Sequence, residues 1–350
     1  MPLAYYIYKY PYKLIWHILK IFRRKPKVVF YCADPIDFII FKPVQKYLPE
    51  IPIVVKNKRT ANYLKQNNIK YQKMPSFPDA VIMCRHAAHK FPEGKIVKVG
   101  MRHGAYHFKR FTNPRNYNAF DLYLLTSSAE LKFAESLMIS SAKAVGFPKL
   151  DSAFDGTYGN DYLTNLKNNM NLDENKKTVV FSATWDKSGM SAIDKWYNKL
   201  DRLSKLYNIL VTVHPWTLQK YIQRLKSYST IYFIESPDIL PYLMIADVLV
   251  SDTSSIIGEF CALDKPIITF RAPQGKHSIP EIREMIKNIS IQINNFEEIY
   301  DAIKRCLKNP KEKSPERKAA NKIMFDNLDG KAGERAAREI EKLLKEKGLM

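Results

Sequence analysis

The sequence predicts an α/β fold, with two Rossmann-like domains in tandem that are each built on a parallel sheet. Short runs of β-branched residues alternate with helix-sized stretches, which is the pattern of parallel strands joined by helices. The alternation comes in two series, separated by a polar stretch at residues 155–173 that we expect to be the hinge region. A chain of 350 residues also exceeds what one hydrophobic core usually organises, so two domains are expected.

The first series predicts an N-terminal domain at residues 27–160. Its strands are runs rich in valine, isoleucine and aromatic residues, which suit buried positions in a sheet. These strands are expected at residues 28–32, 53–55, 80–84, 97–101 and 122–125. Helices are expected between them at residues 38–47 and 59–66.

The second series predicts a C-terminal domain at residues 161–312. Its strands are expected at residues 178–181, 209–213, 231–233, 248–250, 267–270 and 289–293. Its helices are expected at residues 191–206, 218–228, 239–245, 256–263 and 296–307. A charged linker at 311–317 leads into a final helix at 332–345, within a separate C-terminal helical segment at 313–350.

The N-terminal segment, residues 1–26, is basic and aromatic. Residues 1–27 contain seven lysines and arginines, seven aromatic residues and no acid. Aromatic rings with polar tips among cations suit the headgroup layer of a membrane, so we predict docking on an anionic membrane surface. The alternative is a helix packed on the domain, with an inward face of Leu14, Ile15, Ile18 and Leu19.

The expected location is the cytoplasm, at the inner face of the cell membrane. The sequence lacks both a secretory signal and an apolar run near the roughly 20 residues that span a bilayer. Four scattered cysteines fit reduced thiols better than a disulfide or zinc framework. His86 and His89 have no evident third ligand, so no metal site is predicted.

The net charge of +21 indicates an anionic partner, which could be nucleic acid, an anionic membrane or a phosphorylated substrate. No RNP strand, zinc finger or KH loop is present, so no nucleic-acid partner is expected.

Residues 248–270 form the most informative stretch, which reads as strand, polar turn, helix and strand. The turn at 251–255 offers hydroxyl groups and Asp252 to cap the helix that follows. A strand that opens through such a turn into a helix N-terminus is an anion site. Gly258 adds a point of close approach, and Glu259 adds a carboxylate able to bind sugar hydroxyls. We interpret the stretch as a nucleotide-diphosphate site; an ordinary capped crossover is the alternative.

Two histidines follow strands in the same way, one in each domain. His103, with Gly104, follows the strand at 97–101, and His214 follows the strand at 209–213. At the carboxyl ends of parallel strands they are expected to face one cleft between the domains. One imidazole could accept a proton from an attacking hydroxyl and the other could stabilise phosphoryl charge, with Lys109 and Arg110 adding positive charge. A structural role for each histidine is the alternative.

Several short motifs resemble one known family. They are Arg102-His103-Gly104 with Lys109, then residues 120–127 and 145–151, Thr184-Trp185-Asp186, His214-Pro215, and residues 251–255. In this order and spacing, across residues 97–270, they are similar to the CDP-glycerol glycerophosphotransferases of teichoic-acid and related polymer synthesis.

The resemblance implies a GT-B fold, in which two Rossmann-like domains face a cleft, and a transfer that needs neither metal nor cofactor. By the same resemblance His103 is the base, His214 steadies the diphosphate, and Glu259 holds the ribose. The residues expected around the donor are Ser254, Ser255, Thr253, Asp252, Glu259, Gly258, Thr184 and Arg271. Those expected near phosphate or acceptor are Gly104, Lys109 and Arg110.

The predicted function is transfer of glycerol phosphate from CDP-glycerol to a hydroxyl of a lipid-linked or glycan acceptor, with release of CMP, in cell-envelope polymer synthesis. One alternative keeps the GT-B fold and uses a nucleotide sugar as donor. A second alternative, from a different class, is a non-catalytic basic protein that binds a membrane or nucleic acid through charge.

Overall fold

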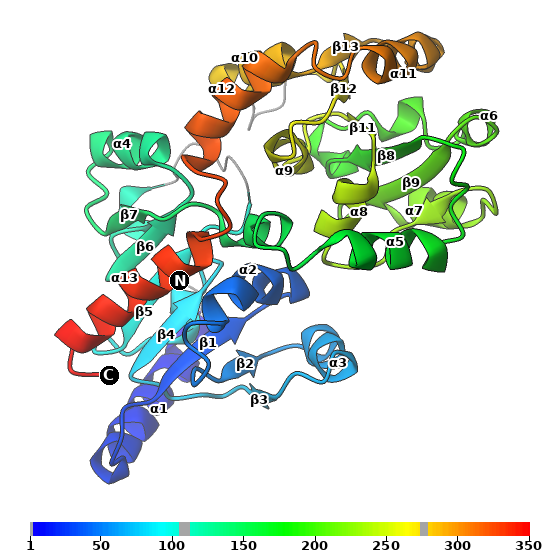
Figure 1. Ribbon diagram of the computed structural model, residues 1–350. Helices are drawn as coiled ribbons and strands as arrows, with labels where there is room; N and C mark the ends of the chain where they lie inside the picture. The colour runs from blue at the N-terminus through cyan, green and yellow to red at the C-terminus, as the bar shows by residue number, and fades with distance from the viewer. Residues whose placement is uncertain (1–2, 105–112, 274–278) are drawn as a thin grey trace. The chain divides into compact units, whose positions relative to one another are not determined.

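The computed structural model describes residues 3–104, 113–273 and 279–350, which form two compact units (Figure 1). Unit 1 is made of three stretches of the chain: residues up to His103, the stretch that ends at Asp151, and Asp329–Met350. Unit 2 is formed by Ser152–Leu328 together with Gly104. The C-terminal stretch therefore belongs to the same unit as the N-terminus.

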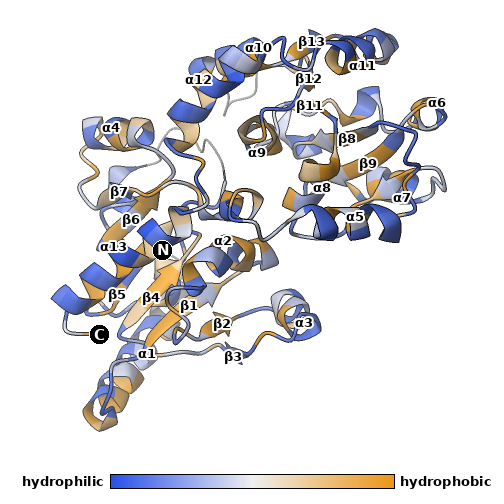
Figure 2. Cartoon of the chain, in the orientation of Figure 1, coloured by the Kyte–Doolittle hydropathy of each residue, from blue (hydrophilic) through white to orange (hydrophobic). Residues whose placement is uncertain are grey.

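Unit 1 is built on a seven-stranded parallel sheet of order β3-β2-β1-β4-β5-β6-β7. The strands are β1 (Val28–Cys32), β2 (Ile53–Val55), β3 (Tyr71–Lys73), β4 (Ala80–Met83), β5 (Val97–Met101), β6 (Leu122–Leu125) and β7 (Ala142–Ala144). The central strands are apolar along their length, as Figure 2 shows, and helices cover them. A parallel sheet buried on both faces requires such strands.

Three of the helices of unit 1 begin at side-chain caps that the sequence supplies locally. They are α1 (Leu3–Phe22), α2 (Pro35–Gln45), α3 (Lys58–Gln66), α4 (Ser128–Ser136) and α13 (Ala332–Glu346), with short 3₁₀ turns η1 (Ala88–Lys90), η2 (Pro114–Asn116) and η3 (Pro148–Ala153). Asp34 caps α2, Asn57 caps α3 and Ser127 caps α4, each accepting a backbone N–H of the first turn.

Helix α1 is attached to unit 1 by three aromatic side chains along one face. The Tyr8 hydroxyl donates to the carbonyl of Lys90, the Tyr12 hydroxyl to that of Ser76, and the Trp16 indole to that of Pro78, all at 2.7 Å. Near its C-terminal end, Lys20 and Arg23 pair with the carboxylate of Asp79 at 2.6 Å. The helix is therefore a fixed part of unit 1.

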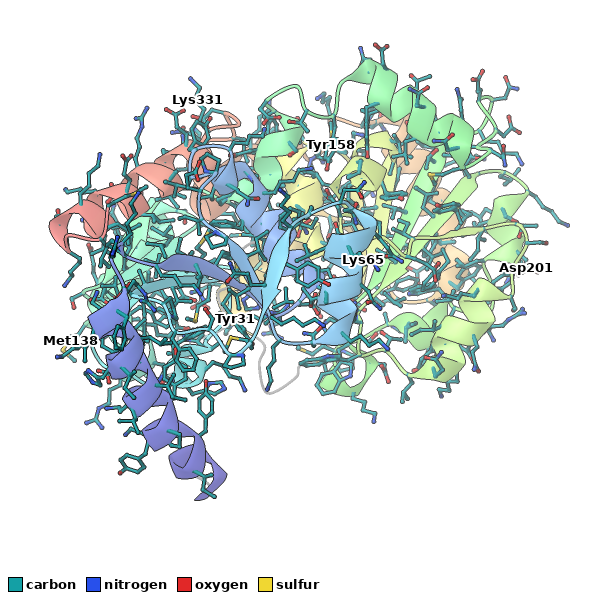
Figure 3. The ribbon with its side chains drawn as sticks, turned by 90° about the horizontal axis from the view of Figure 1, so that it is seen from below. Tyr31, Lys65, Met138, Tyr158, Asp201 and Lys331 are labelled. Carbon is teal, nitrogen blue, oxygen red and sulfur yellow. The ribbon has the colours of Figure 1, made fainter. Side chains whose placement is uncertain are left out.

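The other faces of α1 expose large apolar side chains. These are Ile7, Tyr10, Leu14, Ile15, Ile18, Leu19, Ile21 and Phe22, which are 41–79% exposed. The alternative of a helix packed on the domain is thus correct in its packing and wrong in its face, because Leu14, Ile15, Ile18 and Leu19 are exposed and the aromatic residues form the packed face. Figures 1 and 3 show α1 extending beyond the rest of its unit. No helix among the described residues is long and apolar enough to cross a bilayer.

Unit 2 is built on a six-stranded parallel sheet of order β10-β9-β8-β11-β12-β13. Its strands are β8 (Thr178–Ala183), β9 (Asn208–Val213), β10 (Tyr232–Phe233), β11 (Val248–Ser251), β12 (Ile267–Phe270) and β13 (Ile291–Ile293). Its helices are α5 (Asn160–Asn169), α6 (Asp201–Ser204), α7 (Gln219–Lys226), α8 (Leu240–Ile245), α9 (Ile256–Ala262), α10 (Pro280–Ile289), α11 (Ile299–Lys308) and α12 (Ser314–Phe325), with short 3₁₀ turns η4 (Asp186–Ser188), η5 (Ile193–Lys195) and η6 (Phe296–Glu298).

The two sheets share one winding pattern. In each, the chain runs outward from a central strand, then returns to its other side and runs outward again. The order therefore reverses between β1 and β4 in unit 1 and between β8 and β11 in unit 2. In open parallel sheets, ligands bind beyond the carboxyl ends of the strands at this reversal, which is called the topological switch point.

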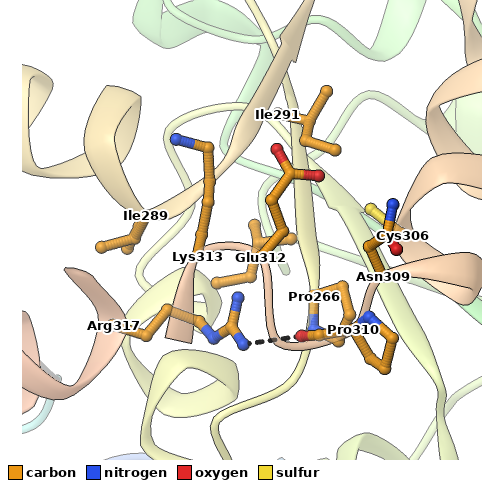
Figure 4. A pocket seen from close by; sticks show the side chains of 10 residues that line it. Pro266, Ile289, Ile291, Cys306, Asn309, Pro310, Glu312, Lys313 and Arg317 are labelled. Carbon is orange, nitrogen blue, oxygen red and sulfur yellow. Dashed lines mark hydrogen bonds between the residues drawn. The ribbon is translucent and has the colours of Figure 1, made fainter. Parts of the chain in front are cut away.

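Helix α12 is held on unit 2 by a buried arginine. Arg317 donates from Nε to Asp264 Oδ1 at 2.9 Å and from Nη2 to the Pro310 carbonyl at 3.0 Å, a contact drawn in Figure 4. The cavity beside it measures only about 10 Å³, room for one water at most. Arg317 thus fills a structural position between α12 and the turn that follows α9.

Helix α13 returns the chain to unit 1. Both oxygens of the buried Asp151 carboxylate accept first-turn N–H groups of this helix, from Ala332 at 3.0 Å and Gly333 at 2.6 Å. Arg335 donates to the Val145 carbonyl at 2.9 Å. The predicted single segment at 313–350 is therefore divided, because α12 packs on α9 in unit 2 while α13 packs on α2 in unit 1.

Other sequence expectations also need correction. The polar stretch at 155–173, expected to be the hinge region, contains α5, which packs against α8 within unit 2. The helix expected at 191–206 reduces to η5 and α6 with turns between them. The last strand begins at Ile291, two residues later than expected, because Ile289 ends α10. The sequence did not reveal α4, α10, α12, or the short strands β3 and β7.

Gly333 is the point where α13 lies closest to α2. A Cβ at this position would lie 2.7 Å from the carbonyl carbon and oxygen of Pro43, so one helix would have to move. We predict that Gly333→Ala lowers the melting temperature by several degrees, although alanine is the better helix former by about 1 kcal/mol. Gly94→Ala is the matched control, because nothing lies within 4 Å of its Cβ. Equal melting temperatures for both variants, measured by calorimetry, would show that the helices do not meet here.

Candidate functional site

Four of the places predicted to bind the nucleotide donor lie at the carboxyl ends of the unit 2 strands, which we call the carboxyl edge of the sheet. Thr184 follows β8, His214 follows β9, the turn at 251–255 follows β11, and Arg271 follows β12. Because these neighbouring strands are parallel, their carboxyl ends share this edge. Thr184 and the turn flank the topological switch point between β8 and β11.

Asp252 organises this edge from a buried position. Its carboxylate accepts the backbone N–H groups of Thr184 at 3.0 Å, Ala192 at 3.0 Å and Ser254 at 3.1 Å. It also accepts the N–H of Thr253 and the hydroxyl of Ser191. Burial raises the pKa of Asp252, and these hydrogen bonds oppose that rise.

This bonding changes the role expected for Asp252. A carboxylate has about four lone-pair positions, and internal donors already occupy them. Asp252 is also only 1% exposed. The Asp252 side chain therefore fixes the shape of the turn and does not contact a nucleotide substrate. The expected cap is found only in part: Asp252 bonds within the turn, whereas the Ser254 hydroxyl accepts the N–H of Ile256, the first residue of α9, at 3.5 Å.

The remaining residues of the turn and of α9 differ in accessibility. Ser255 is exposed and Thr253 is half-buried, whereas Ser254, Gly258 and Glu259 are buried. The Ser254 hydroxyl lies 3.5 Å from that of Ser182, which joins the ends of β11 and β8. The Thr253 hydroxyl donates to the Met190 carbonyl at 3.4 Å, so the Ser255 hydroxyl is the one in the turn best placed to meet a ligand from outside.

His214 has a defined tautomer. The backbone N–H of Trp216 donates to its Nδ1 at 3.1 Å, so a neutral ring carries its proton on Nε2. The imidazole can therefore donate a hydrogen bond from Nε2 to an anion. Trp216 is 66% exposed, and its ring lies edge-on to both His214 and Trp185 at 5.2 and 5.4 Å. Sequence reasoning missed Trp216; its position two residues after the histidine was the available signal.

Lys195 is a second residue that the sequence did not reveal. Its ammonium donates to the carbonyls of Arg271 at 3.1 Å and Asn294 at 2.8 Å. These carbonyls follow β12 and β13, so Lys195 joins the two loops. The exposed side chain of Arg271 is thereby held on a fixed backbone at the same edge as His214.

In unit 1, His103 lies just beyond β5 and has the opposite tautomer. Its Nδ1 is 3.1 Å from the carbonyl oxygen of Cys84, which can only accept. Nδ1 therefore carries the proton of the neutral ring, and the lone pair is on Nε2. A ring held in this way can accept a proton from a hydroxyl. The adjoining Gly104 is buried, and the predicted Lys109 and Arg110 lie outside the described residues.

The end of β5 is fixed by a buried ion pair. Arg102, next to His103, lies 2.6 Å from the carboxylate of Glu130. Its guanidinium also lies over the rings of Tyr117 and Tyr123. Breaking a buried pair of this kind is costly, so the backbone that carries His103 is held firmly.

A buried acid that the sequence did not single out lies at the switch point of unit 1. Asp37 accepts the N–H groups of Ala33 and Asp34 and the Nε–H of Arg85, all at 3.0 Å. Burial raises the pKa of Asp37 to about 6, more than Arg85 lowers it. The signal was the Asp34-x-x-Asp37 spacing, which forms a capping box at the start of α2.

No group of three metal-ligating side chains occurs within residues 3–104, 113–273 and 279–350. His86 lies against the rings of Tyr117 and Tyr123. The four cysteines are free and buried, and burial raises the pKa of Cys261 and Cys306 to about 12.

Comparison with known proteins places this geometry in context. The sequence model of the family described as CDP-Glycerol:Poly(glycerophosphate) glycerophosphotransferase matches residues 94–342. The teichoic acid ribitol-phosphate polymerase TarL of Staphylococcus aureus is 25% identical over 203 residues, 54% of this chain and 35% of that protein. The teichoic acid glycerol-phosphate primase of Bacillus subtilis is 27% identical over 169 residues, 46% of this chain and 42% of that protein. The chain thus spans well under half of these relatives.

Solved structures show the same fold at low identity. The wall teichoic acid polymerase TagF superposes with a TM-score of 0.66 at 16% identity, covering 97% of this chain and 98% of that chain. The UDP-GlcNAc 2-epimerase of Neisseria meningitidis superposes with a TM-score of 0.61 at 14% identity, covering 91% of this chain and all of that one. The predicted GT-B fold class is confirmed.

The buried Asp37 predicts a pH dependence of stability. The folded state binds this proton more tightly than the unfolded chain, in which aspartate titrates near 3.8. The contribution of Asp37 to the free energy of unfolding should therefore decrease as the pH rises from about 4 to about 6, then level off. Asp37→Asn cannot titrate, so the difference between wild type and variant, measured by urea unfolding across this range, should change with pH. A constant difference would contradict the assignment.

Proposed function

Because the chain belongs to the CDP-glycerol:poly(glycerophosphate) glycerophosphotransferase family, we propose that it transfers a polyol phosphate from a CDP-linked donor to an acceptor hydroxyl in cell-envelope polymer synthesis. We propose glycerol phosphate as the transferred group. The observation that carries the proposal, beyond membership, is the pair of histidines with opposite tautomers. One is poised to accept a proton and the other to donate a hydrogen bond to an anion.

The donor is assigned to the carboxyl edge of the unit 2 sheet. In this proposal its diphosphate lies next to the turn at 251–255, where Ser255 presents an exposed hydroxyl group. Nε2–H of His214 donates to a phosphate oxygen, and Arg271 supplies positive charge. Glu259 is assigned to the ribose by the resemblance of its motif; its side chain is buried, so the ribose would have to reach it at the base of α9.

In the proposed reaction, Nε2 of His103 takes the proton of the acceptor hydroxyl as its oxygen attacks the phosphorus that bears the polyol. A new P–O bond forms, and the bond from that phosphorus to the bridging oxygen breaks. CMP leaves with the electron pair of the broken bond. His214 and Arg271 stabilise the charge on the phosphoryl oxygens. In a step of this kind the protein mainly aligns the acceptor hydroxyl with the phosphorus and supplies positive charge.

The acceptor is proposed to be a lipid-linked or glycan chain, reached by docking on the inner face of the cell membrane. Helix α1 supports this proposal. Ile7, Leu14, Ile18 and Ile21 recur at helical spacing, so they form one exposed apolar stripe. Three lysines lie along the helix, which contains no acid, and two arginines directly follow it. An anionic bilayer fits this combination, because it accepts apolar side chains and attracts cations.

The histidine roles predict different losses in two variants. His103→Gln should lower CMP release from CDP-glycerol in the presence of acceptor by about 10²–10⁴-fold, because the base is lost. It should still be stabilised by CDP in a thermal-shift measurement. His214→Gln should weaken both CMP release and the CDP shift, because its Nε2 donor is gone. Stabilisation of the wild type by UDP-sugars but not by CDP-glycerol would favour a nucleotide-sugar donor and overturn the proposal.

Membrane docking predicts that Leu14→Gln with Ile18→Gln lowers binding to vesicles of phosphatidylglycerol and phosphatidylcholine by at least about tenfold. Burial of each large apolar side chain is worth about 1.5–3 kcal/mol. The control is Leu206→Gln with Ile323→Gln, which alters two apolar side chains of unit 2 that are 56% and 43% exposed. Flotation of the α1 variant as efficiently as wild type would exclude α1 as the docking surface.

A further inference from the structure

The backbone carbonyl of Cys84 sets the tautomer of His103, and this carbonyl lies just beyond the end of β4. Its oxygen is 3.1 Å from Nδ1 of the imidazole. Strand β4 pairs with β1 and β5 as far as Met83, opposite Tyr31 and Gly100, and Cys84 is the next residue. The direction of the Cys84 carbonyl therefore depends on contacts that are made beyond the paired part of the strand.

Asp37 contacts both residues that flank this carbonyl. The carbonyl belongs to the peptide group that joins Cys84 to Arg85. Arg85 donates from Nε to Oδ1 of Asp37 at 3.0 Å. The Cys84 thiol, a weak donor, lies 3.7 Å from the backbone oxygen of Asp37. Because a peptide group is planar, the positions of the two flanking residues limit the directions in which its carbonyl can point.

Asp37 is itself held in one position. It lies in the first turn of α2, and its Oδ2 atom accepts the backbone N–H groups of Ala33 and Asp34, both at 3.0 Å. Its side chain is only 1% exposed, so it does not meet a substrate. Of the two acids that pair with Arg85, Asp37 is the nearer, at 3.0 Å against 4.0 Å for Asp34. Any effect of Asp37 on the reaction is therefore exerted through the residues that it holds.

We propose that Asp37 is a positioning residue for the proposed base: through Arg85 and Cys84 it holds the carbonyl that keeps the proton of His103 on Nδ1. The inference rests on the proposed function, in which Nε2 of His103 takes the proton of the acceptor hydroxyl. A neutral histidine without such a partner favours the proton on Nε2, which removes the lone pair that the reaction needs. The wrong tautomer of a catalytic histidine lowers turnover by orders of magnitude.

The first measurement reads the tautomer directly and needs no substrate. Nitrogen-15 NMR of the full chain, labelled at its histidines and kept at about pH 8 so that imidazoles are neutral, shows which ring nitrogen carries the proton. The signal of His103 is the one lost in His103→Gln. We expect the proton on Nδ1 in the wild type, and a shift toward the Nε2–H form in Asp37→Asn and in Arg85→Gln. Asparagine has a single side-chain oxygen, so it cannot accept from both Arg85 and the N–H groups.

The second measurement is turnover with CDP-glycerol and acceptor. Each of the two variants should lower kcat by about tenfold or more, because less of His103 has its lone pair on Nε2. The thermal shift with CDP should stay at the wild-type value, because the proposed donor residues lie in unit 2. The side chain of Arg85 is 36% exposed, so Arg85→Gln is expected to fold even where the buried Asp37→Asn does not.

The matched control is Arg59→Gln. Arg59 also pairs with Asp34, at 3.7 Å, but it lies in α3 and does not flank the Cys84 carbonyl. It should keep the wild-type tautomer and turnover. If His103 keeps its proton on Nδ1 in Arg85→Gln, or if the control shifts it as much, the proposal is overturned, even where turnover falls. A shifted tautomer in the variants, with no CMP release by the wild type, would support the positioning role and count against the proposed function.

Discussion

The buried carboxylate of Asp252 is the constraint on which the donor edge depends. It joins the loop after β8, the segment at Ser191 and Ala192, and the turn after β11 through hydrogen bonds to a single side chain. The neighbouring parallel strands β8 and β11 end here and their chains diverge. The backbone N–H groups beyond the strand ends no longer pair within the sheet, so they need other acceptors. Because Asp252 supplies those acceptors internally, the turn keeps its shape while the Ser255 side chain stays exposed.

Unit 1 has a buried aspartate, Asp37, in the position that corresponds to Asp252 in unit 2. Asp37 binds the N–H groups that follow β1 and the guanidinium of Arg85, which follows β4. In each unit a buried aspartate thus spans the point where strand order reverses. The two sites differ in charge: Asp37 has a cation beside it, whereas Asp252 is satisfied mainly by backbone dipoles. The positive charge of Arg59 and Arg85 is therefore partly neutralised by Asp34 and Asp37.

The sequence was sufficient for the fold class and for the positions along the chain of the strands that are buried on both faces, because their long apolar runs indicate burial. It did not predict the order of the strands within each sheet. Strands β3 and β7 were missed because each is three residues long and carries polar side chains at a sheet edge. The site residues could be placed after their strands, but the histidine tautomers could not be predicted. They depend on the Cys84 carbonyl and the Trp216 amide, which only the folded loops position. Asp151 and Gly333 meet across 182 positions of sequence, a distance that local patterns do not encode.

The return of the chain to unit 1 also has a consequence for biosynthesis. Residues 329–350 complete a body whose other parts begin at the N-terminus, so unit 2 is inserted within unit 1 in the order of translation. During translation, all of unit 2 is synthesised before α13, so the apolar surface of α2 that α13 covers stays exposed until the end of synthesis. Domains generally fold as they emerge from the ribosome. Unit 1 is therefore expected to complete its folding after unit 2, and to be the unit that needs a chaperone.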